Sequence, residues 1–273
     1  MVKILRTGMV AIAMLVFALV QVAAKDRYFI LAGQSNMVGQ GKVKKLPDKF
    51  RMIAKNVAIY SSDNYEKTLN TGLGNKKLFG PEITFSHALS RYYPEDRIVI
   101  LKFAVGGSSL LAWSPNWDRQ SAAITKDEEK GPLYSKMITF FEKLPLFNNK
   151  ELSKLSIDGI LWMQGEKDAR FPAAGNNYLD NIITLIKALR TDFDAKNTPF
   201  ILGRVDPPAV IYPARDTVRD QQFQIQSEYP NVTMVDADGL SKWDDNLHFD
   251  TKGQLELGLR FAKVYINLID QNK

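Results

Sequence analysis

Five short apolar runs, separated by helical patterns, constrain the fold of this 273-residue chain more than any other feature. The runs are nearly continuous in apolar residues, which is typical of parallel strands covered on both faces. They are DRYFILA (26–32), RIVILKFA (97–104), IDGILWM (157–163), PFILGRV (199–205) and VTMVD (232–236), and VAIY (57–60) is a candidate for an extra strand.

Five segments between and after these runs have helical patterns. They are GPEITFSHALSRYYP (80–94), LYSKMITFFEKLPLF (133–147), NYLDNIITLIKALRTDF (177–193), RDTVRDQQFQIQSEYP (215–230) and TKGQLELGLRFAKVYINLID (251–270). Thr251 is the predicted N-cap of the last helix. The repeated order of strand and helix predicts a layered α/β domain with right-handed crossovers.

The chain shows no internal repeat and no linker rich in Pro, Gly or Ser, so we expect a single domain over residues 25–273. Residues 61–80 and 113–132 read as long loops, and loops of that length in a compact domain are often functional.

Residues 1–24 have the layout of a secretory signal peptide. Lys3 and Arg6 precede an apolar stretch that ends in the small residues Val22, Ala23 and Ala24. This layout predicts export to the periplasm or the medium, with no stable membrane association after cleavage. An uncleaved membrane anchor is the alternative, although about 17 apolar residues is at the short limit for a bilayer span.

The absence of cysteine excludes disulfides and thiolate chemistry. The formal net charge is +6, and it falls to +4 when residues 1–24 are removed with Lys3 and Arg6. The densest basic cluster, GKVKKLPDK (41–49), has no interleaved aromatic residues. We therefore expect a solvated loop there and no nucleic-acid partner.

Small or polar residues follow each predicted strand, at the edge of the sheet where open α/β sheets bind ligands. In chain order they are Ser35; Gly106 and Gly107; Gln164, Glu166 and Asp168; Arg204; and, in the loop before the last helix, Asp245 and His248.

The chain has two histidines. His87 lies within a predicted helix and reads as a packed or surface residue. His248 lies in a polar loop, three residues after Asp245. A carboxylate at that spacing can bind the imidazole Nδ1–H and leave Nε2 free to take a proton from a serine. The spacing favours Asp245 over Asp244 and Asp250 as the partner.

These residues together indicate a serine hydrolase. A serine hydroxyl needs a base before it becomes a useful nucleophile. The oxyanion that forms needs fixed hydrogen-bond donors. The backbone N–H groups of Ser35 and Gly107 and the side-chain amide of Gln164 are candidates for these donors.

The chain resembles the SGNH/GDSL-type hydrolases, and within them the carbohydrate-esterase branch that includes sialate O-acetylesterases and acetylxylan esterases. The resemblance spans nearly all of the chain after residue 24. It is carried by GQSNMVG around Ser35, FGPE (79–82), AVGGSSL (104–110), WMQGEKDA (162–169), VRDQQ (218–222) and DNLHFDTKGQLELGLR (245–260).

This resemblance implies a flavodoxin-like three-layer α/β/α sandwich with a mostly parallel five-stranded sheet. It also implies Ser35 as nucleophile, His248 as base and Asp245 as its orienting acid. Gly107 and Gln164 would complete the oxyanion hole, with Gln164 in place of the asparagine of the wider superfamily. The implied activity removes O-acetyl groups from sialic acid or xylan-type glycans, without a metal or other cofactor.

Several roles stay open. Gly106 is the alternative to Gly107 as oxyanion donor. Glu166 and Asp168 either support the site or act directly, and Gln34 and Asn36 either orient the serine loop or contact substrate. Arg204 either binds substrate or pairs with an acid, and Trp113 and Trp117 are candidates to stack on a sugar ring.

Two other functions compete with the acetylesterase. A general short-chain arylesterase or lipase on the same fold would need a wide apolar acyl pocket. A non-catalytic carbohydrate-binding protein is the alternative from outside the enzymes. The intact set of Ser35, Asp245 and His248 argues against it, and sites rather than folds decide function.

Overall fold

The structure is a computed structural model that describes residues 24–63, 66–69, 77–147 and 151–271. The expected signal peptide lies outside the described residues apart from Ala24, so export stays a prediction. Within the described ranges, no helix combines the length and the apolar character needed to cross a bilayer.

The five predicted strands are present and parallel. They are β1 (Asp26–Gly33), β6 (Arg97–Ala104), β7 (Ile157–Met163), β8 (Phe200–Gly203) and β9 (Val232–Val235). They lie in the order β6-β1-β7-β8-β9, which is the flavodoxin-like order 2-1-3-4-5. The predicted fold class is therefore confirmed.

The sheet is larger than the five strands that we predicted. Strand β3 (Val57–Asp63) pairs in parallel with β6 and makes six parallel strands, and β4 (Glu66–Leu69) adds an antiparallel edge beyond it. The candidate run VAIY is thus a strand, and it continues through Ser61, Ser62 and Asp63, which are buried. These polar residues gave the end of the strand the composition of a loop.

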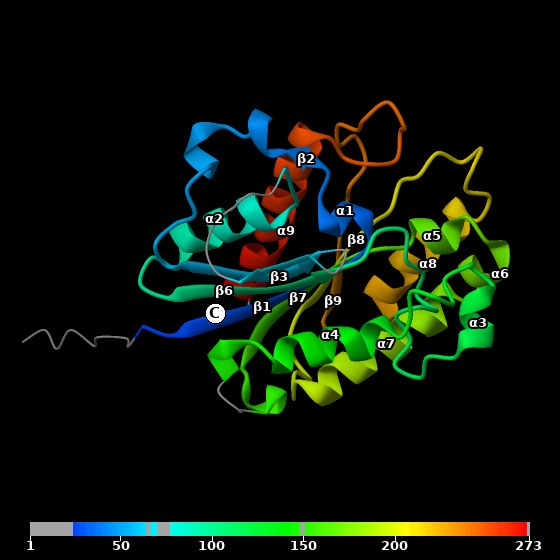
Figure 1. The fold of residues 1–273 in the computed structure, drawn as a ribbon, viewed down its shortest axis with the longest axis horizontal. Helices are drawn as coiled ribbons and strands as arrows, with labels where there is room; N and C mark the ends of the chain where they lie inside the picture. Colours follow the sequence, from blue (N-terminus) through cyan, green and yellow to red (C-terminus); the bar gives the residue numbers. More distant parts are fainter. Residues whose placement is uncertain (1–23, 64–65, 70–76, 148–150, 272–273) are drawn as a thin grey trace, which may run out of the picture.

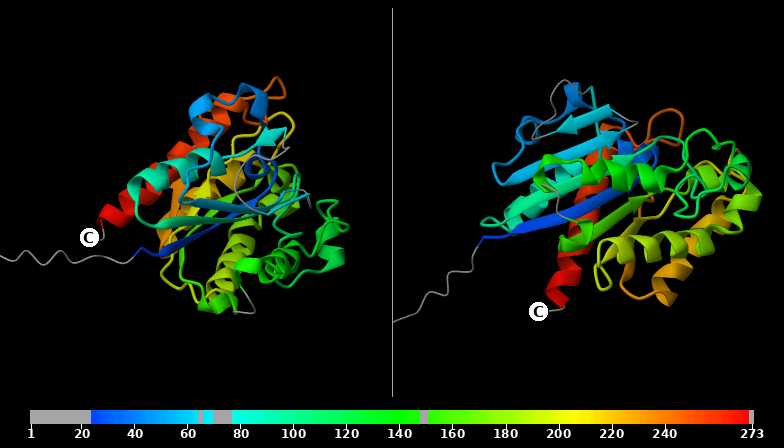
Figure 2. Two further views of the ribbon diagram at one scale, coloured as in Figure 1. Left: turned by 60° about the vertical axis from the view of Figure 1, so that its left-hand side comes forward. Right: turned by 60° about the horizontal axis from the view of Figure 1, so that its bottom comes forward.

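Helices cover both faces of the sheet (Figure 1). On one face lie α2 (Glu82–Tyr92) and α9 (Thr251–Gln271), and on the other lie α4 (Leu133–Glu142), α7 (Tyr178–Asp192) and α8 (Arg215–Glu228). The two turned views in Figure 2 show the same three layers. Phe29 of the central strand β1 packs edge-on against Phe85 of α2 and Tyr265 of α9, with ring centroids 5.3 and 5.0 Å apart.

The two predicted long loops contain regular structure. Residues 61–80 include the end of β3, strand β4, and β5 (Leu78–Phe79), which pairs with β2 (Gly41–Lys42). Residues 113–132 include α3 (Arg119–Ala123). The remaining short helices are α1 (Ser35–Val38), α5 (Glu166–Ala169) and α6 (Pro172–Gly175), with 3-10 turns at Val43–Lys45, Asp48–Phe50, Pro145–Phe147 and Leu152–Lys154.

The start of α9 corrects our predicted cap. The carboxylate of Asp250 accepts a hydrogen bond from the Gly253 N–H at 2.9 Å, which is the N-cap contact. The Thr251 hydroxyl instead accepts from the Lys42 N–H at 3.0 Å. The basic segment 41–49 is therefore joined to α9 and is not a free loop, although Lys44, Lys45 and Lys49 are exposed.

Candidate active site

The turn after β1 places Ser35 at the edge of the sheet. Gly33 has φ +147°, and a Cβ there would lie 2.1 Å from the Met163 carbonyl oxygen, so only glycine fits. The chain then enters α1, whose first residue is Ser35, and leaves it through Gly39 at φ +101°. β1 is the strand at which the order reverses, which is where ligand sites form in this fold.

Ser35, His248 and Asp245 are joined by hydrogen bonds. His248 Nε2 lies 3.0 Å from Ser35 Oγ, and His248 Nδ1 lies 2.7 Å from Asp245 Oδ2. The other Asp245 oxygen accepts from the backbone N–H groups of Leu247 and His248, both at 2.9 Å. Burial raises the pKa of Asp245, but these hydrogen bonds from His248 and Leu247 outweigh it and hold the pKa below its usual range.

The alternative partner Asp250 and the second histidine have other contacts. Asp250 accepts from the Ser241 hydroxyl at 2.6 Å and caps α9, so it is not oriented toward His248. His87 lies in α2 and packs edge-on against the Phe50 ring, as a packed histidine would. Burial, with Arg91 and Lys49 nearby, lowers the pKa of His87.

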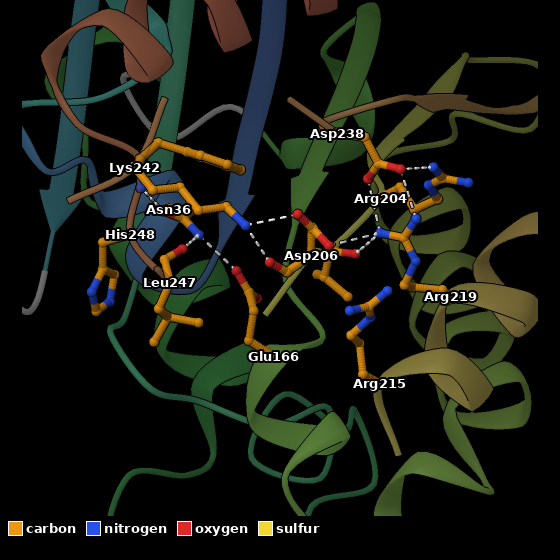
Figure 3. A network of polar contacts seen from close by, with 12 residues as sticks. Asn36, Glu166, Arg204, Asp206, Arg215, Arg219, Asp238, Lys242, Leu247 and His248 are labelled. Carbon is orange, nitrogen blue, oxygen red and sulfur yellow. Dashed lines mark hydrogen bonds and ion pairs between the residues drawn. The ribbon is translucent and has the colours of Figure 1, made fainter. Parts of the chain in front are cut away.

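Asn36 fixes the loop that carries His248. Its Nδ2 donates to Leu247 O at 3.2 Å, and its Oδ1 accepts from the Phe249 N–H at 3.0 Å. These two residues flank His248. The same Nδ2 donates to Glu166 Oε1 at 2.8 Å, and Figure 3 shows Asn36 between Glu166 and Leu247. Asn36 therefore orients the loop, which is one of its two expected roles.

Glu166 and Asp168 are buried, and both accept hydrogen bonds from residues that surround the site. Burial raises the pKa of Glu166, against the hydrogen bonds that it accepts from its own N–H and from Asn36. Burial also raises the pKa of Asp168 to about 7. Asp168 accepts from the Leu110 N–H at 3.1 Å and from Gln164 Nε2. Both carboxyl groups thus occupy supporting positions.

The geometry does not support Gln164 as an oxyanion donor. Its side chain is fully buried, and Nε2 donates to Ser108 O at 2.9 Å and to Asp168 Oδ2. An amide nitrogen has two hydrogens, and these two acceptors use both. Gln164 instead ties the end of β7 to the loop after β6. The sequence could not predict this, because Ser108 and Asp168 are brought to Gln164 only by the fold.

The backbone N–H groups of Ser35 and Gly107 are better placed as donors. Among the described residues, neither N–H donates to a backbone or side-chain acceptor. Gly107 has φ +60°, a left-handed conformation that glycine adopts without strain. Its neighbour Gly106 is also partly exposed at this edge of the sheet. The choice between the two glycines stays a prediction.

Gln34 orients the serine turn from inside the protein. It is 2% exposed, and its N–H donates to Met163 O at 2.9 Å. Its Oε1 accepts from the Lys167 N–H at 3.2 Å at the start of α5. These contacts join the loops that follow β1 and β7.

Trp113 is not available to a sugar, which corrects that expectation. Its side chain is fully buried and packs edge-on against Phe103 and Trp162, with centroids 5.7 and 5.1 Å apart. Its indole N–H donates to the Ser108 hydroxyl at 2.9 Å. The segment reads as a polar loop, but its tryptophan completes the core under α4. Trp117 is partly exposed and lies directly against Gly131.

Arg204 pairs with acids, which is one of its two expected roles. Its guanidinium binds Asp238 and lies 3.3 Å from Asp236. Arg219 forms a two-pronged pair with the same Asp238 at 2.9 and 2.8 Å. Figure 3 shows this cluster continuing through Asp206 toward the histidine loop.

Sequence reasoning missed a buried ion cluster behind the serine turn. Lys102 of β6 is fully buried, and its Nζ contacts Glu82 at 2.8 Å, Asp63 at 3.3 Å and the Val38 carbonyl oxygen at 2.9 Å. It therefore binds the end of α1, the helix that begins with Ser35. A single lysine within the apolar run RIVILKFA was the signal that could have predicted it.

A second missed residue, Asp127, supports the glycine loop. Asp127 is buried, and its Oδ2 accepts from the Ser109 N–H at 2.7 Å. Its Oδ1 lies 3.2 Å from Lys130 and 3.5 Å from Lys167. Lys130 in turn donates to Gly107 O. Within the described ranges, no three His, Asp or Glu side chains are grouped so that they could hold a metal ion.

Ser35 is hydrogen-bonded to a histidine–carboxylate pair at the carboxyl edge of a flavodoxin-like sheet. This is the arrangement of an SGNH-type hydrolase. The family described as carbohydrate esterase, sialic acid-specific acetylesterase matches residues 25–267. The chain therefore belongs to this family of carbohydrate esterases.

Individual relatives agree with this assignment. A protein of Arabidopsis thaliana named "Probable carbohydrate esterase" is 28% identical over 261 residues, which cover 89% of this chain and 91% of that protein. Its crystal structure superposes with a TM-score of 0.68 and 27% identity, over 88% of this chain and 98% of that one.

Two more distant structures share the fold. A carbohydrate acetylesterase from Xanthomonas citri has a TM-score of 0.65 at 17% identity, over 86% of this chain and 55% of that one. NanS has a TM-score of 0.65 at 15% identity, over 91% of this chain and 99% of that one.

Proposed function

We propose that this protein is a serine esterase that removes O-acetyl groups from carbohydrates, with sialic acid or xylan-type glycans as substrates. The observation that carries the proposal is the continuous set of hydrogen bonds from Ser35 Oγ through His248 to Asp245. Membership of the carbohydrate esterase family supports the acetylated sugar as substrate.

In the first half of the reaction, Ser35 Oγ attacks the acetyl carbonyl carbon while His248 Nε2 takes the hydroxyl proton. Asp245 holds the ring through Nδ1 and stabilises the imidazolium that forms. The N–H groups of Ser35 and Gly107 donate to the oxyanion of the tetrahedral intermediate. When the intermediate collapses, the ester C–O bond breaks and His248 returns the proton to the sugar oxygen, leaving Ser35 acetylated.

In the second half, a water molecule takes the place of the sugar hydroxyl. His248 removes a proton from the water as its oxygen attacks the acetyl carbonyl carbon. The same two N–H groups stabilise the second oxyanion. Collapse breaks the bond to Ser35 Oγ, which receives the proton from His248, and acetate leaves. The cycle uses no group beyond these residues and water.

Acetate release by residues 25–273 tests the proposal. The substrates are a chromogenic acetate ester, an O-acetylated sialic acid and acetylated xylan, each with the wild type and with Ser35→Ala. We expect release from at least one glycan, and loss of release in Ser35→Ala with the fold unchanged. His87→Asn is the matched control, because it alters the histidine outside the site and should keep activity.

Release by Ser35→Ala at close to the wild-type rate would overturn the nucleophile assignment. Release from the chromogenic ester without any release from the two glycans would favour a general short-chain arylesterase. A folded protein that binds a glycan and releases acetate from none of the substrates would favour the non-catalytic binding protein.

A further inference from the structure

A cavity of about 560 Å³ lies on the other side of the loop that carries His248. We name it the lysine–tryptophan cavity. Lys45, Lys49, Phe50, Trp243, Lys252 and Leu259 are among its lining residues. The volume lies within the range of about 300–1,000 Å³ that is typical of small-molecule sites. None of the residues assigned above to the ester chemistry lines it.

The cavity lining carries more positive than negative charge, with three lysines against two acids. Lys45, Lys49 and Lys252 are exposed, and none of the three forms an ion pair with a carboxylate among the described residues. The two acids of the lining have hydrogen-bond or ion-pair partners outside the three lysines, and Asp250 also interacts electrostatically with Lys252. Asp250 accepts from Ser241 and caps α9, and Glu256 pairs with Arg260 at 3.2 Å. An anionic ligand would therefore meet three cations without displacing an internal ion pair.

Trp243 gives the cavity a fixed aromatic surface. Its indole N–H donates to Gln40 O at 3.1 Å, and Lys42 lies over the ring, 4.2 Å from the centroid. The buried Phe50 ring and the 41%-exposed Leu259 add apolar surface. An aromatic plane beside apolar and cationic groups suits a sugar ring that carries a carboxylate, because the ring offers a C–H face and the carboxylate offers charge.

The cavity is joined directly to the catalytic loop. The backbone N–H of Trp243 donates to His248 O at 2.9 Å, so the two residues close one turn of the chain. The ring of His248 is directed to Ser35, while the ring of Trp243 lines the cavity. A glycan chain held in the cavity would thus lie next to the turn that carries the base.

We propose that the lysine–tryptophan cavity binds a carboxylate-bearing stretch of an acidic glycan, of the uronic-acid type, next to the sugar whose acetyl ester reacts at Ser35. The reacting sugar itself lies outside the cavity. The proposal rests on the acetylesterase function for its link to catalysis, but the binding of the acidic chain is a separate property with its own readout.

Calorimetric titration of Ser35→Ala measures the binding of the acidic chain separately from catalysis. The probes are a trigalacturonate, a neutral xylotriose and a single-stranded oligonucleotide, all at low and at moderate salt. One variant adds Lys45→Gln, Lys49→Gln and Lys252→Gln. The matched control adds Lys154→Gln, Lys187→Gln and Lys196→Gln, which removes the same charge from exposed positions outside the cavity.

We expect the trigalacturonate to bind more tightly than the xylotriose and to weaken as salt screens the lysines. The cavity variant should lose at least about tenfold in affinity, because it loses the contacts of three lysines with the carboxylates of the trigalacturonate. The control variant should bind as the parent does. Equal binding of the neutral sugar, equal loss in both lysine variants, or equally tight binding of the oligonucleotide would each overturn the proposal.

Turnover measurements distinguish a failure of the cavity proposal from a failure of the esterase function. With Ser35 intact, the cavity variant should hydrolyse the small chromogenic acetate ester at the wild-type rate, because that ester does not reach the lysines. Ser35-dependent turnover without trigalacturonate binding would overturn the cavity proposal alone. Trigalacturonate binding that depends on the three lysines, in a protein without esterase turnover, would overturn the esterase function and leave the binding site standing.

Discussion

The side-chain amide of Asn36 donates a hydrogen bond to the carboxyl group of Glu166 at 2.8 Å, and both residues are almost completely buried. Glu166 thereby fixes the amide that binds Leu247 and Phe249, the two neighbours of His248. The residue that follows the serine therefore sets the position of the histidine. His248 Nε2 lies 3.0 Å from Ser35 Oγ in this arrangement.

Replacing Asn36 with alanine should misplace His248 while leaving its chemistry intact. We expect kcat to fall on the order of 10²-fold, because a shift of about 1 Å in a catalytic group has effects of that size. KM for a small acetate ester should change little. Steady-state kinetics measures both, with the exposed Asn197→Ala as a control. Wild-type turnover in Asn36→Ala would show that the loop holds His248 without it.

Glu166 can be tested through its charge. Burial raises the pKa of Glu166 and so favours the neutral carboxyl group. Glu166→Gln keeps an oxygen for Asn36 and should retain activity within a few fold. Glu166→Ala leaves the buried amide without this partner and should lower the free energy of unfolding by about 1–3 kcal/mol. Urea unfolding and acetate release measure the two effects, and an inactive but stable Glu166→Gln would show that the charge is required.

Asp245 and Asp250 form a matched pair of aspartates around His248. Asp245→Asn should lower kcat on the order of 10⁴-fold, as loss of the orienting carboxylate does in other triads. Asp250→Asn should leave kcat near the wild type and keep the cap of α9, because the side-chain oxygen of asparagine caps a helix about as well as that of aspartate. Kinetics and thermal unfolding of both variants distinguish the roles. Loss of activity in Asp250→Asn alone would reverse the assignment.

The sequence predicted the parts of the site that depend on local spacing. The order of strands and helices placed Ser35, Gly107 and His248 at one edge, and the three-residue spacing identified Asp245. These positions are predictable because a strand end and a short loop determine where such side chains lie.

The errors concern residues whose partners come from distant segments. Gln164 was expected to face the substrate, but Ser108 and Asp168 bind both hydrogens of its amide. Trp113 is by sequence a candidate to stack on a sugar ring, but it packs in the core against Trp162. Spacing along the chain carries no information on such contacts. For Lys102 the sequence did carry a signal, because a lysine in a buried parallel strand requires buried acids.

Lys102 should matter for stability because it neutralises two buried carboxylates. Lys102→Met removes the charge that Glu82 and Asp63 face and should lower the free energy of unfolding by about 3–5 kcal/mol. Adding Glu82→Gln should recover part of the loss, since one uncompensated charge is then removed. Urea unfolding measures this, with the exposed Lys187→Met as a control. An equal loss in the single and the double variant would show that packing, and not charge, is responsible.

Asp168 should make stability depend on pH. Burial raises the pKa of Asp168 to about 7 in the folded protein, above its ordinary value. Between these two values the unfolded chain is ionised while the folded protein keeps the proton, so the folded state binds more protons. Stability should therefore fall as pH rises from about 4 to about 8, by up to about 4 kcal/mol from this group.

Asp168→Asn removes that titration and keeps an oxygen for Leu110 and Gln164. We expect the variant to lose less stability than the wild type over the same rise in pH, because a neutral side chain has no proton to release. Urea unfolding at several pH values measures the difference, and the exposed Asp194→Asn should follow the wild type. Identical slopes for Asp168→Asn and the wild type would mean that Asp168 is ionised throughout, with Gln164 and Leu110 compensating its burial.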